Sequence, residues 1–390
     1  MKEINDIIKA YEEAQTRQKQ TALATVVHVN GSSYRRPGAR MLITEDGELT
    51  GAISGGCLEG DALRKSLLAI MEQKTKLVTY DTNDEDDAKM GLGLGCNGII
   101  QVLIESIDPS NPNNPIQLLK KATAIRQNAS LITLFSLQDK RAPQPGLCLL
   151  VTDDQYILGN AAFLKETQLE ETLIANAKQV IALKKSAFKN YISQDQNITA
   201  FIEYIKPPVS LVIIGAGNDV LPLVNMSGIM GWQTTIIDGR PHYSSGERFP
   251  GSCQVLTTKP EGLLQQIPID DQTAFVLMTH NYNYDLAMLR VLLQQDLAYI
   301  GMLGPKKKLT RMLDELRAEG QALTPLQLSI IHSPVGLDIG AETPEEIALS
   351  IMAEIKAVLA RRYPFFLTEK NDVIHARSAT LIEEIRLNSL

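Results

Sequence analysis

The residues best suited to holding a phosphorylated ligand begin with Gly215-Ala216-Gly217-Asn218. They follow the apolar run 211–214 and open a helical pattern, which is the context of a dinucleotide-binding turn. Glycines allow a tight turn and let a diphosphate approach the positive end of the helix. Asp238 ends the next apolar run, where a carboxylate commonly holds a ribose hydroxyl, and Arg240 follows it. These residues predict a nucleotide site, and the alternative is the same fold with an empty cleft.

A second polar group follows two later strand patterns in the same half of the chain. Thr279 and His280 follow the apolar run 275–278, while Gly304 and Lys306 follow the run 299–302. In doubly wound sheets, ligands bind beyond the carboxyl ends of the strands. Lysines at a helix start oppose the helix dipole, which indicates an anionic ligand there. The alternatives are a surface lysine cluster and a structural hydrogen-bonding role for His280.

Two glycine-rich loops in the first hundred residues each carry a cysteine. Ser54-Gly55-Gly56-Cys57 places a thiol near a helix start, whose positive end favours thiolate. Cys96 lies in the second loop, and Arg35 and Arg36 add cations that suit phosphate or carboxylate. The set suits a soft metal or a pterin phosphate. The alternative is that these cysteines are small buried hydrophobes, as we interpret Cys148.

The hydrophobic pattern predicts an N-terminal mixed α+β domain that positions these loops. A helix is predicted through Ile4 and Tyr11, and another from near Cys57 to about Glu72. A hairpin is predicted around Asp46-Gly47. Further strands are predicted at 23–29, 76–80, 99–104, 131–135, 147–151 and 156–158, with a helix at 116–126.

The second half of the chain alternates strand and helix patterns, which predicts a Rossmann-like parallel sheet with helices on both faces. Strands are expected at 211–214, 234–237, 275–278, 299–302 and 330–331, with helices at 219–230, 284–293, 306–318 and 344–359. Pro207-Pro208 interrupts regular structure, so the main boundary is placed near 205. We expect domains at 1–205 and 206–362, a C-terminal extension at 363–390 with one more helical pattern, and an optional boundary near 108–115.

Composition narrows the class of protein. The 390 residues are 44% hydrophobic and 21% charged, which is typical of a globular chain. A net charge of −7 argues against nucleic acid as a partner. No apolar run is long enough to span a membrane, no cysteines have zinc-site spacing, and no signal peptide is visible. We expect a cytoplasmic protein with free thiols, no membrane contact and, by default, a homodimeric assembly.

Several motifs, read in order, resemble those of the xanthine dehydrogenase accessory factors, the XdhC/CoxI family. The N-terminal motifs lie at 31–41, 55–59 and 91–98. Those of the second half lie at 215–217, 237–240, 247–250, 279–281, 299–301, 333–340 and 343–348. Residues 1–205 are therefore expected to form the XdhC/CoxI-like domain.

The resemblance implies a maturation factor rather than an enzyme with turnover. It implies a chaperone that binds the molybdenum cofactor, as molybdopterin or its dinucleotide form, and protects it. The chaperone passes the cofactor to an apo molybdenum hydroxylase, with a cysteine desulfurase as an implied partner in sulfuration. The resemblance assigns the role of the family's first glycine–cysteine loop to Gly55, Gly56 and Cys57. It assigns the role of the second loop to Cys96. Cys57 is then the candidate contact to molybdenum.

Three positions depart from the family pattern. Asn218 replaces a common histidine, Asn97 interrupts the second loop, and Pro305 with lysines replaces an arginine-rich motif. Lysine lacks the bidentate fork with which arginine grips phosphate. An alternative function is an NAD(P)-dependent oxidoreductase that uses the Rossmann-like domain, and a third is a scaffold with a vestigial cleft.

Overall fold

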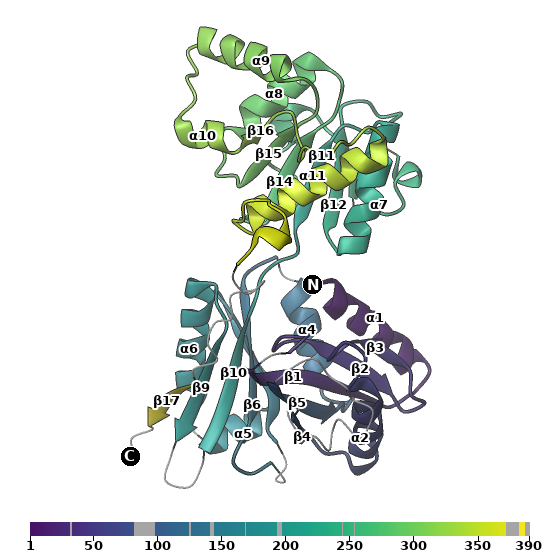
Figure 1. The fold of residues 1–390 in the computed structure, drawn as a ribbon, viewed down its shortest axis with the longest axis vertical. Helices are drawn as coiled ribbons and strands as arrows, with labels where there is room; N and C mark the ends of the chain where they lie inside the picture. The colour runs from purple at the N-terminus through teal and green to yellow at the C-terminus, as the bar shows by residue number, and fades with distance from the viewer. Residues whose placement is uncertain are drawn as a thin grey trace. The chain divides into compact units, whose positions relative to one another are not determined.

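The computed structural model describes residues 1–31, 33–81, 98–124, 126–140, 144–167, 169–192, 197–243, 245–252, 254–371 and 382–386. It divides the chain into two compact units (Figure 1). Unit 1 comprises Met1 and residues 3–207 and 375–390, and unit 2 comprises Lys2 and residues 208–374. The division falls between Pro207 and Pro208, where neither residue has an N–H to extend a strand ladder.

Unit 2 is a doubly wound α/β unit. Its strands are β11 (Ser210–Ile214), β12 (Gln233–Asp238), β13 (Gln254–Thr257), β14 (Thr273–Leu277), β15 (Tyr299–Met302) and β16 (Ile331–His332). All pair in parallel, in the order β13-β12-β11-β14-β15-β16. The order reverses between β11 and β14, which is the Rossmann arrangement. The predicted fold class is confirmed, whereas β13 is a short, half-exposed strand that the hydrophobic pattern did not predict.

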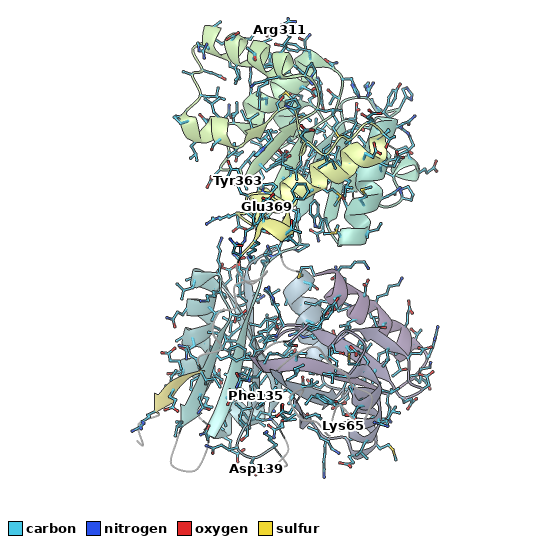
Figure 2. The ribbon with its side chains drawn as sticks, viewed as in Figure 1. Lys65, Phe135, Asp139, Arg311, Tyr363 and Glu369 are labelled. Atoms are coloured by element: carbon cyan, nitrogen blue, oxygen red, sulfur yellow. The ribbon has the colours of Figure 1, made fainter. Side chains whose placement is uncertain are left out.

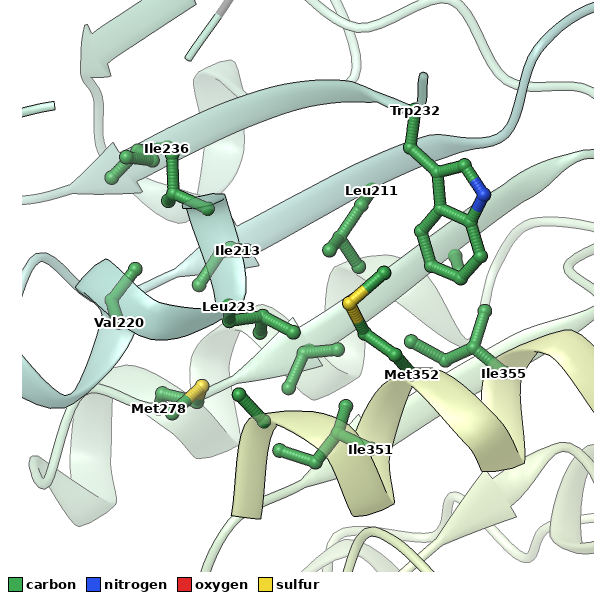
Figure 3. Packing of buried hydrophobic residues seen from close by; sticks show 14 of the residues in the cluster. Leu211, Ile213, Val220, Leu223, Trp232, Ile236, Met278, Ile351, Met352 and Ile355 are labelled. Carbon is green, nitrogen blue, oxygen red and sulfur yellow. The ribbon is translucent and has the colours of Figure 1, made fainter. Parts of the chain in front are cut away.

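Helices cover both faces of this sheet. They are α7 (Leu221–Met230), α8 (Tyr282–Leu292), α9 (Lys306–Ala318), α10 (Pro325–Ser329) and α11 (Pro344–Leu359), with 3-10 turns η1 (Asn218–Val220), η2 (Gly246–Arg248), η3 (Pro260–Gly262) and η4 (Leu367–Glu369). Leu211 and Ile213 face α7 and α11, in the core that Figure 3 shows. Val212 and Ile214 face α8 and α9. Alternate residues of β11 thus enter opposite cores, as expected for a strand buried on both sides.

Unit 1 contains two sheets. The first has the order β3-β2-β1-β5-β4 and is antiparallel. Its elements are α1 (Lys2–Thr16), β1 (Thr21–Gly31), β2 (Arg40–Thr44), β3 (Leu49–Gly51), α2 (Glu59–Glu72), β4 (Lys76–Asp81) and β5 (Gly98–Ser106). Helix α2 begins at Glu59, so Cys57 precedes it by two residues.

The second sheet of unit 1 has the order β17-β9-β10-β6-β7-β8. Its elements are α4 (Pro115–Ala124), β6 (Ala129–Phe135), β7 (Gly146–Thr152), β8 (Tyr156–Leu158), α5 (Ala161–Thr167), α6 (Glu170–Leu183), β9 (Ala187–Ile192), β10 (Asn197–Ile205) and β17 (Ile382–Arg386). β17 pairs in parallel with β9. The helical pattern expected at the C-terminus is therefore wrong for 382–386, where the edge of β9 imposes a strand.

The two sheets of unit 1 share apolar layers. Phe135, labelled in Figure 2, packs with Phe201 of its own sheet and with Val27 and Leu103 of the other. The predicted apolar face of α1 lies in a neighbouring core that also contains α4. Cys148 is fully buried, which confirms its interpretation as a core residue. No helix in the described part of the chain has the length and hydropathy to span a bilayer.

Candidate functional site

The first glycine of the predicted nucleotide turn lies at the point where the strand order reverses. Gly215 follows β11 and has a φ of +127°, which side-chain-bearing residues rarely adopt. A Cβ at this position would lie 2.5 Å from the carbonyl oxygen of Met278, next to the end of β14. The turn therefore brings the ends of the two central strands, β11 and β14, into direct contact.

The Asp238 carboxylate closes this turn from β12. It accepts hydrogen bonds from the amide of Ala216 at 3.0 Å and from the amide of Arg240 at 2.9 Å. Arg240 also donates from Nε and Nη2, at 3.0 and 2.9 Å. Burial alone raises the pKa of Asp238, but the hydrogen bonds from Arg240 and Ala216 outweigh it and hold the pKa below its ordinary value. A ribose hydroxyl at this carboxylate must therefore compete with Arg240.

Arg248 is a site residue that the sequence interpretation missed. Its guanidinium donates to the carbonyl of Ala216 and to Oδ1 of Asn218, both at 2.9 Å. It lies 5.5 Å from the centre of the Tyr243 ring, and Arg240 lies 3.9 Å from the same ring. The Glu247-Arg248-Phe249-Pro250 motif was a usable signal, because it belongs to the resemblance. Two arginines thus flank the glycine turn, and the charge of Arg240 is compensated by Asp238.

His280 and Asp219 form a pair beside the same turn. His280 has a φ of +56° and places its Nε2 3.0 Å from Oδ2 of Asp219. The histidine ring is 69% exposed, so its remaining edge faces solvent. A left-handed backbone at a non-glycine residue marks a position held by its surroundings, and such positions concentrate at functional sites. The pair lies at the carboxyl ends of the central strands.

The lysines at the start of α9 have different surroundings. Lys306 is exposed at the first turn. Lys308 instead donates to the fully buried Asp285 at 2.6 Å, and Asp285 also accepts from Oγ1 of Thr279 at 2.5 Å. Gly304, with a φ of +122°, lies against the Lys308 side chain. Of this cluster, Lys306 is exposed to solvent, while Thr279 and Lys308 stabilise the ends of β14 and β15 through Asp285.

In unit 1, the Ser54–Cys57 loop is organised by one hydroxyl. Oγ of Ser54 accepts from the amides of Gly56, Cys57 and Leu58, at 3.0–3.1 Å, and donates to Glu59. Burial raises the pKa of Glu59, but its hydrogen bonds from Ser54 outweigh that effect and hold the pKa below its ordinary value. Gly55, Gly56 and Cys57 are all exposed. The loop therefore presents a thiol to solvent, and its glycines leave space beside that thiol.

The Arg35-Arg36 segment lies next to this thiol loop. The ring of Tyr34 is 3.5 Å from the position that a Cβ on Gly55 would occupy. Arg35 forms an ion pair with Glu3, and Arg36 is exposed. Cys96, the second predicted thiol, lies outside the described residues. Among the described residues, no group of three or more His, Cys, Asp or Glu side chains is arranged to hold a metal ion.

The predicted residues thus form two groups rather than one. Arg35, Arg36 and 54–57 are neighbours in unit 1. Gly215, Gly217, Asn218, Asp238, Arg240, Thr279 and His280 surround the strand ends of unit 2, with Gly304 and Lys306 at the next strand. Sequence spacing found the glycines and acids of both groups. It did not find the partners Asp219, Arg248 and Asp285, because these contacts join different elements, nor Glu59, whose contact with Ser54 is local.

Comparisons with known proteins match both halves of the chain. A family model described as the XdhC Rossmann domain matches residues 211–355, and one described as the XdhC and CoxI family matches residues 14–81. A protein of Bacillus subtilis (strain 168), named as a probable xanthine dehydrogenase subunit, is 33% identical over 339 residues, or 87% of this chain and 93% of that protein.

Two further relatives span nearly the whole chain. The molybdenum cofactor insertion chaperone PaoD of Escherichia coli (strain K12) is 22% identical over 352 residues, or 90% of this chain and 87% of that protein. A crystal structure described as a xanthine dehydrogenase from Bacillus halodurans superposes with a TM-score of 0.69 at 30% identity. The match covers 92% of this chain and 97% of that one.

Proposed function

The chain belongs to the XdhC and CoxI family, and on that premise we propose that it binds the molybdenum cofactor and delivers it to a xanthine dehydrogenase-type hydroxylase. The similarity to a molybdenum cofactor insertion chaperone supports this role. The proposal includes protection of the cofactor until transfer, a cytoplasmic location and a homodimer. A cysteine desulfurase is the proposed source of the sulfur that completes the cofactor.

The observation that carries the proposal is the exposed Cys57 thiol on its glycine loop. The group to be bound combines a soft metal centre, a flat pterin and an anionic tail. Thiolates are the protein ligands that suit soft metal centres. Gly56 faces open space beside the thiol, and Arg35 and Arg36 lie on the segment whose Tyr34 contacts Gly55. The residues present therefore fit the group.

In this function the chain's own residues hold the cofactor and shield it until transfer. Ser54 fixes the loop by accepting from three successive amides, so the thiol is presented without rearrangement. When bound, the cofactor supplies the redox-active metal and the sulfur chemistry that the client enzyme later uses. In unit 2, considered by itself, the glycine turn and its arginines suit a nucleotide.

Pterin retention tests the proposal. The full chain is produced in cells that make the cofactor, and pterin is measured after release by denaturation for the wild type, Cys57→Ser and Cys148→Ala. We expect retention by the wild type, at least a tenfold loss in Cys57→Ser, and little change in Cys148→Ala, because the Cys148 thiol is fully buried. Equal retention by the Cys57→Ser protein would remove the thiol from the proposal.

A second candidate is an NAD(P)-dependent oxidoreductase. The Rossmann strand order, the Gly215 turn and the Asp219–His280 pair favour it, because such a pair can accept a proton beside a nicotinamide. Titration with NAD and NADP, followed by a search for redox turnover, separates the candidates. Tight binding with turnover favours the oxidoreductase, whereas pterin retention without turnover favours the chaperone.

A further inference from the structure

A cavity of about 490 Å³ lies in unit 1, beside the segment that carries the two arginines. It is bounded by residues 34–39, the start of α1 and the end of β10 with Lys206. This volume is within the range of small-ligand pockets, which are mostly apolar with a few placed polar groups. The lining has that character, because charged side chains alternate with Ile4, Pro37 and Ile205.

The charge of the cavity is set by which of its ions are already neutralised. Arg35, Arg36 and Lys206 line it together with the carboxylates of Glu3 and Glu203. Glu3 is paired with Arg35. Glu203 forms an ion pair with Arg40. The Arg40 side chain is 1% exposed and donates to the carboxylate through both of its terminal nitrogens.

With both carboxylates compensated, the remaining charge of the cavity is positive. Arg36 is exposed and forms no ion pair with another described residue, so its guanidinium supplies this positive charge. An arginine fork matches the geometry of phosphate and carboxylate oxygens, so the cavity favours an anionic group. A cation or a neutral ligand would gain nothing from this arrangement.

Tyr34 connects the lining of the cavity with the thiol loop. Tyr34 lines the cavity, and the same ring packs 3.5 Å from the position of a Cβ on Gly55. Gly55 is two residues from Cys57. A ligand with an anionic group in the cavity can therefore extend along Tyr34 toward the thiol, and the tyrosine ring offers a flat surface for a planar portion of the ligand.

We propose that this cavity is an anion subsite, which holds the phosphorylated end of the ligand whose other end lies at Cys57. The inference rests on the proposed function for the identity of the ligand. It adds that the phosphate is recognised within unit 1, by Arg36. Arg36 is then the residue that sets selectivity for a phosphorylated ligand.

Inorganic pyrophosphate is the probe, measured by titration calorimetry and by hydrogen exchange on the full chain. We expect pyrophosphate to protect amides of 34–39 and 203–206, and Arg36→Gln to weaken binding at this site at least tenfold. Arg36→Lys keeps the charge but loses the two-pronged donor geometry of arginine, so its affinity for pyrophosphate should lie between those of the wild type and Arg36→Gln. Arg64→Gln is the matched control, because Arg64 is an exposed arginine on α2 of the same unit and should leave binding unchanged.

Two outcomes would overturn the subsite. One is pyrophosphate protection confined to unit 2, and the other is unaltered binding by Arg36→Gln. Failure of the proposed function looks different, because pterin retention would then be insensitive to Cys57→Ser while pyrophosphate still protected 34–39. Retention that depends on Cys57 but not on Arg36 would leave the chaperone proposal standing and reject the anion subsite.

Discussion

Gly215 and Gly228 differ in whether the structure has room for a side chain, although both are glycine in the sequence. Gly215 combines a φ of +127° with the backbone of Met278 in its path, so a side chain is excluded twice. Gly228 lies within α7 and faces open space. The first is required by the close approach of two strands, whereas the second only weakens a helix.

We predict opposite effects of alanine at these two glycines. Gly215→Ala should lower the free energy of unfolding of unit 2 by roughly 2–4 kcal/mol, because φ and sterics both oppose it. Gly228→Ala should raise it by about 0.5–1 kcal/mol through helix propensity. Trp232, the single tryptophan, lies in the core of unit 2, so denaturant titration followed by its fluorescence measures both. A harmless Gly215→Ala would contradict the tight turn.

Among the helices of unit 2, α8 and α9 share a buried ion pair that lies at the carboxyl ends of β14 and β15. Asp285 is fully buried on α8 and accepts from Lys308 on α9 and from Thr279 after β14. The start of α11 is fixed differently, by a capping box between Thr343 and Glu346 with Pro344 in the first turn. The family motif at 343–348 thus has a structural explanation, since Thr-x-x-Glu before an apolar run is the signature of this cap.

We predict that the neighbouring lysines of α9 differ sharply. Lys308→Ala should lower the free energy of unfolding of unit 2 by about 3 kcal/mol, because it leaves the Asp285 carboxylate buried without its cation. Lys306→Ala should change it by less than about 0.5 kcal/mol, since Lys306 is exposed. The same fluorescence titration compares the two variants. The double variant Lys308→Met, Asp285→Asn should lose less free energy of unfolding than Lys308→Ala. A greater loss would argue against the importance of the Lys308–Asp285 ion pair.

Across the molecule as a whole, the two units have separate cores, and one buried acid joins the sheets of unit 1. Glu105 on β5 accepts from the amide of Leu147 on β7 at 2.7 Å. Burial raises the pKa of Glu105 to about 7, although the amide of Leu147 and the charge of Arg40 oppose the rise. The folded chain therefore keeps a proton on Glu105 that the unfolded chain releases above its ordinary value of 4.5.

This acid predicts a pH dependence confined to unit 1. Because the folded-state pKa is raised, its stabilising effect is complete below about pH 4.5 and is lost as the pH rises through about 7, by about 3 kcal/mol at most. Glu105→Gln should remove the loss of stability of unit 1 that Glu105 causes between about pH 5 and about pH 8, followed by circular dichroism. The opposite dependence of His28, whose pKa is lowered by burial, should remain. The Trp232 transition should not respond. The exposed Glu12→Gln is the control, and a pH dependence that is the same in Glu105→Gln as in the wild type would exclude this acid.

Local patterns in the amino-acid sequence were enough to predict the Rossmann-like unit, the position of its glycine turn, the buried thiol of Cys148 and the family of the chain. Hydrophobic period, glycine spacing and motif order are all properties of neighbouring residues, so they can be recognised before the chain is folded. Other features became visible only in the folded chain: Arg240 engages Asp238, Lys308 neutralises Asp285, and Glu203 and Lys206 share a cavity with Arg36. Most of these contacts join elements far apart in the chain, and their partners are chosen by packing that no local pattern records.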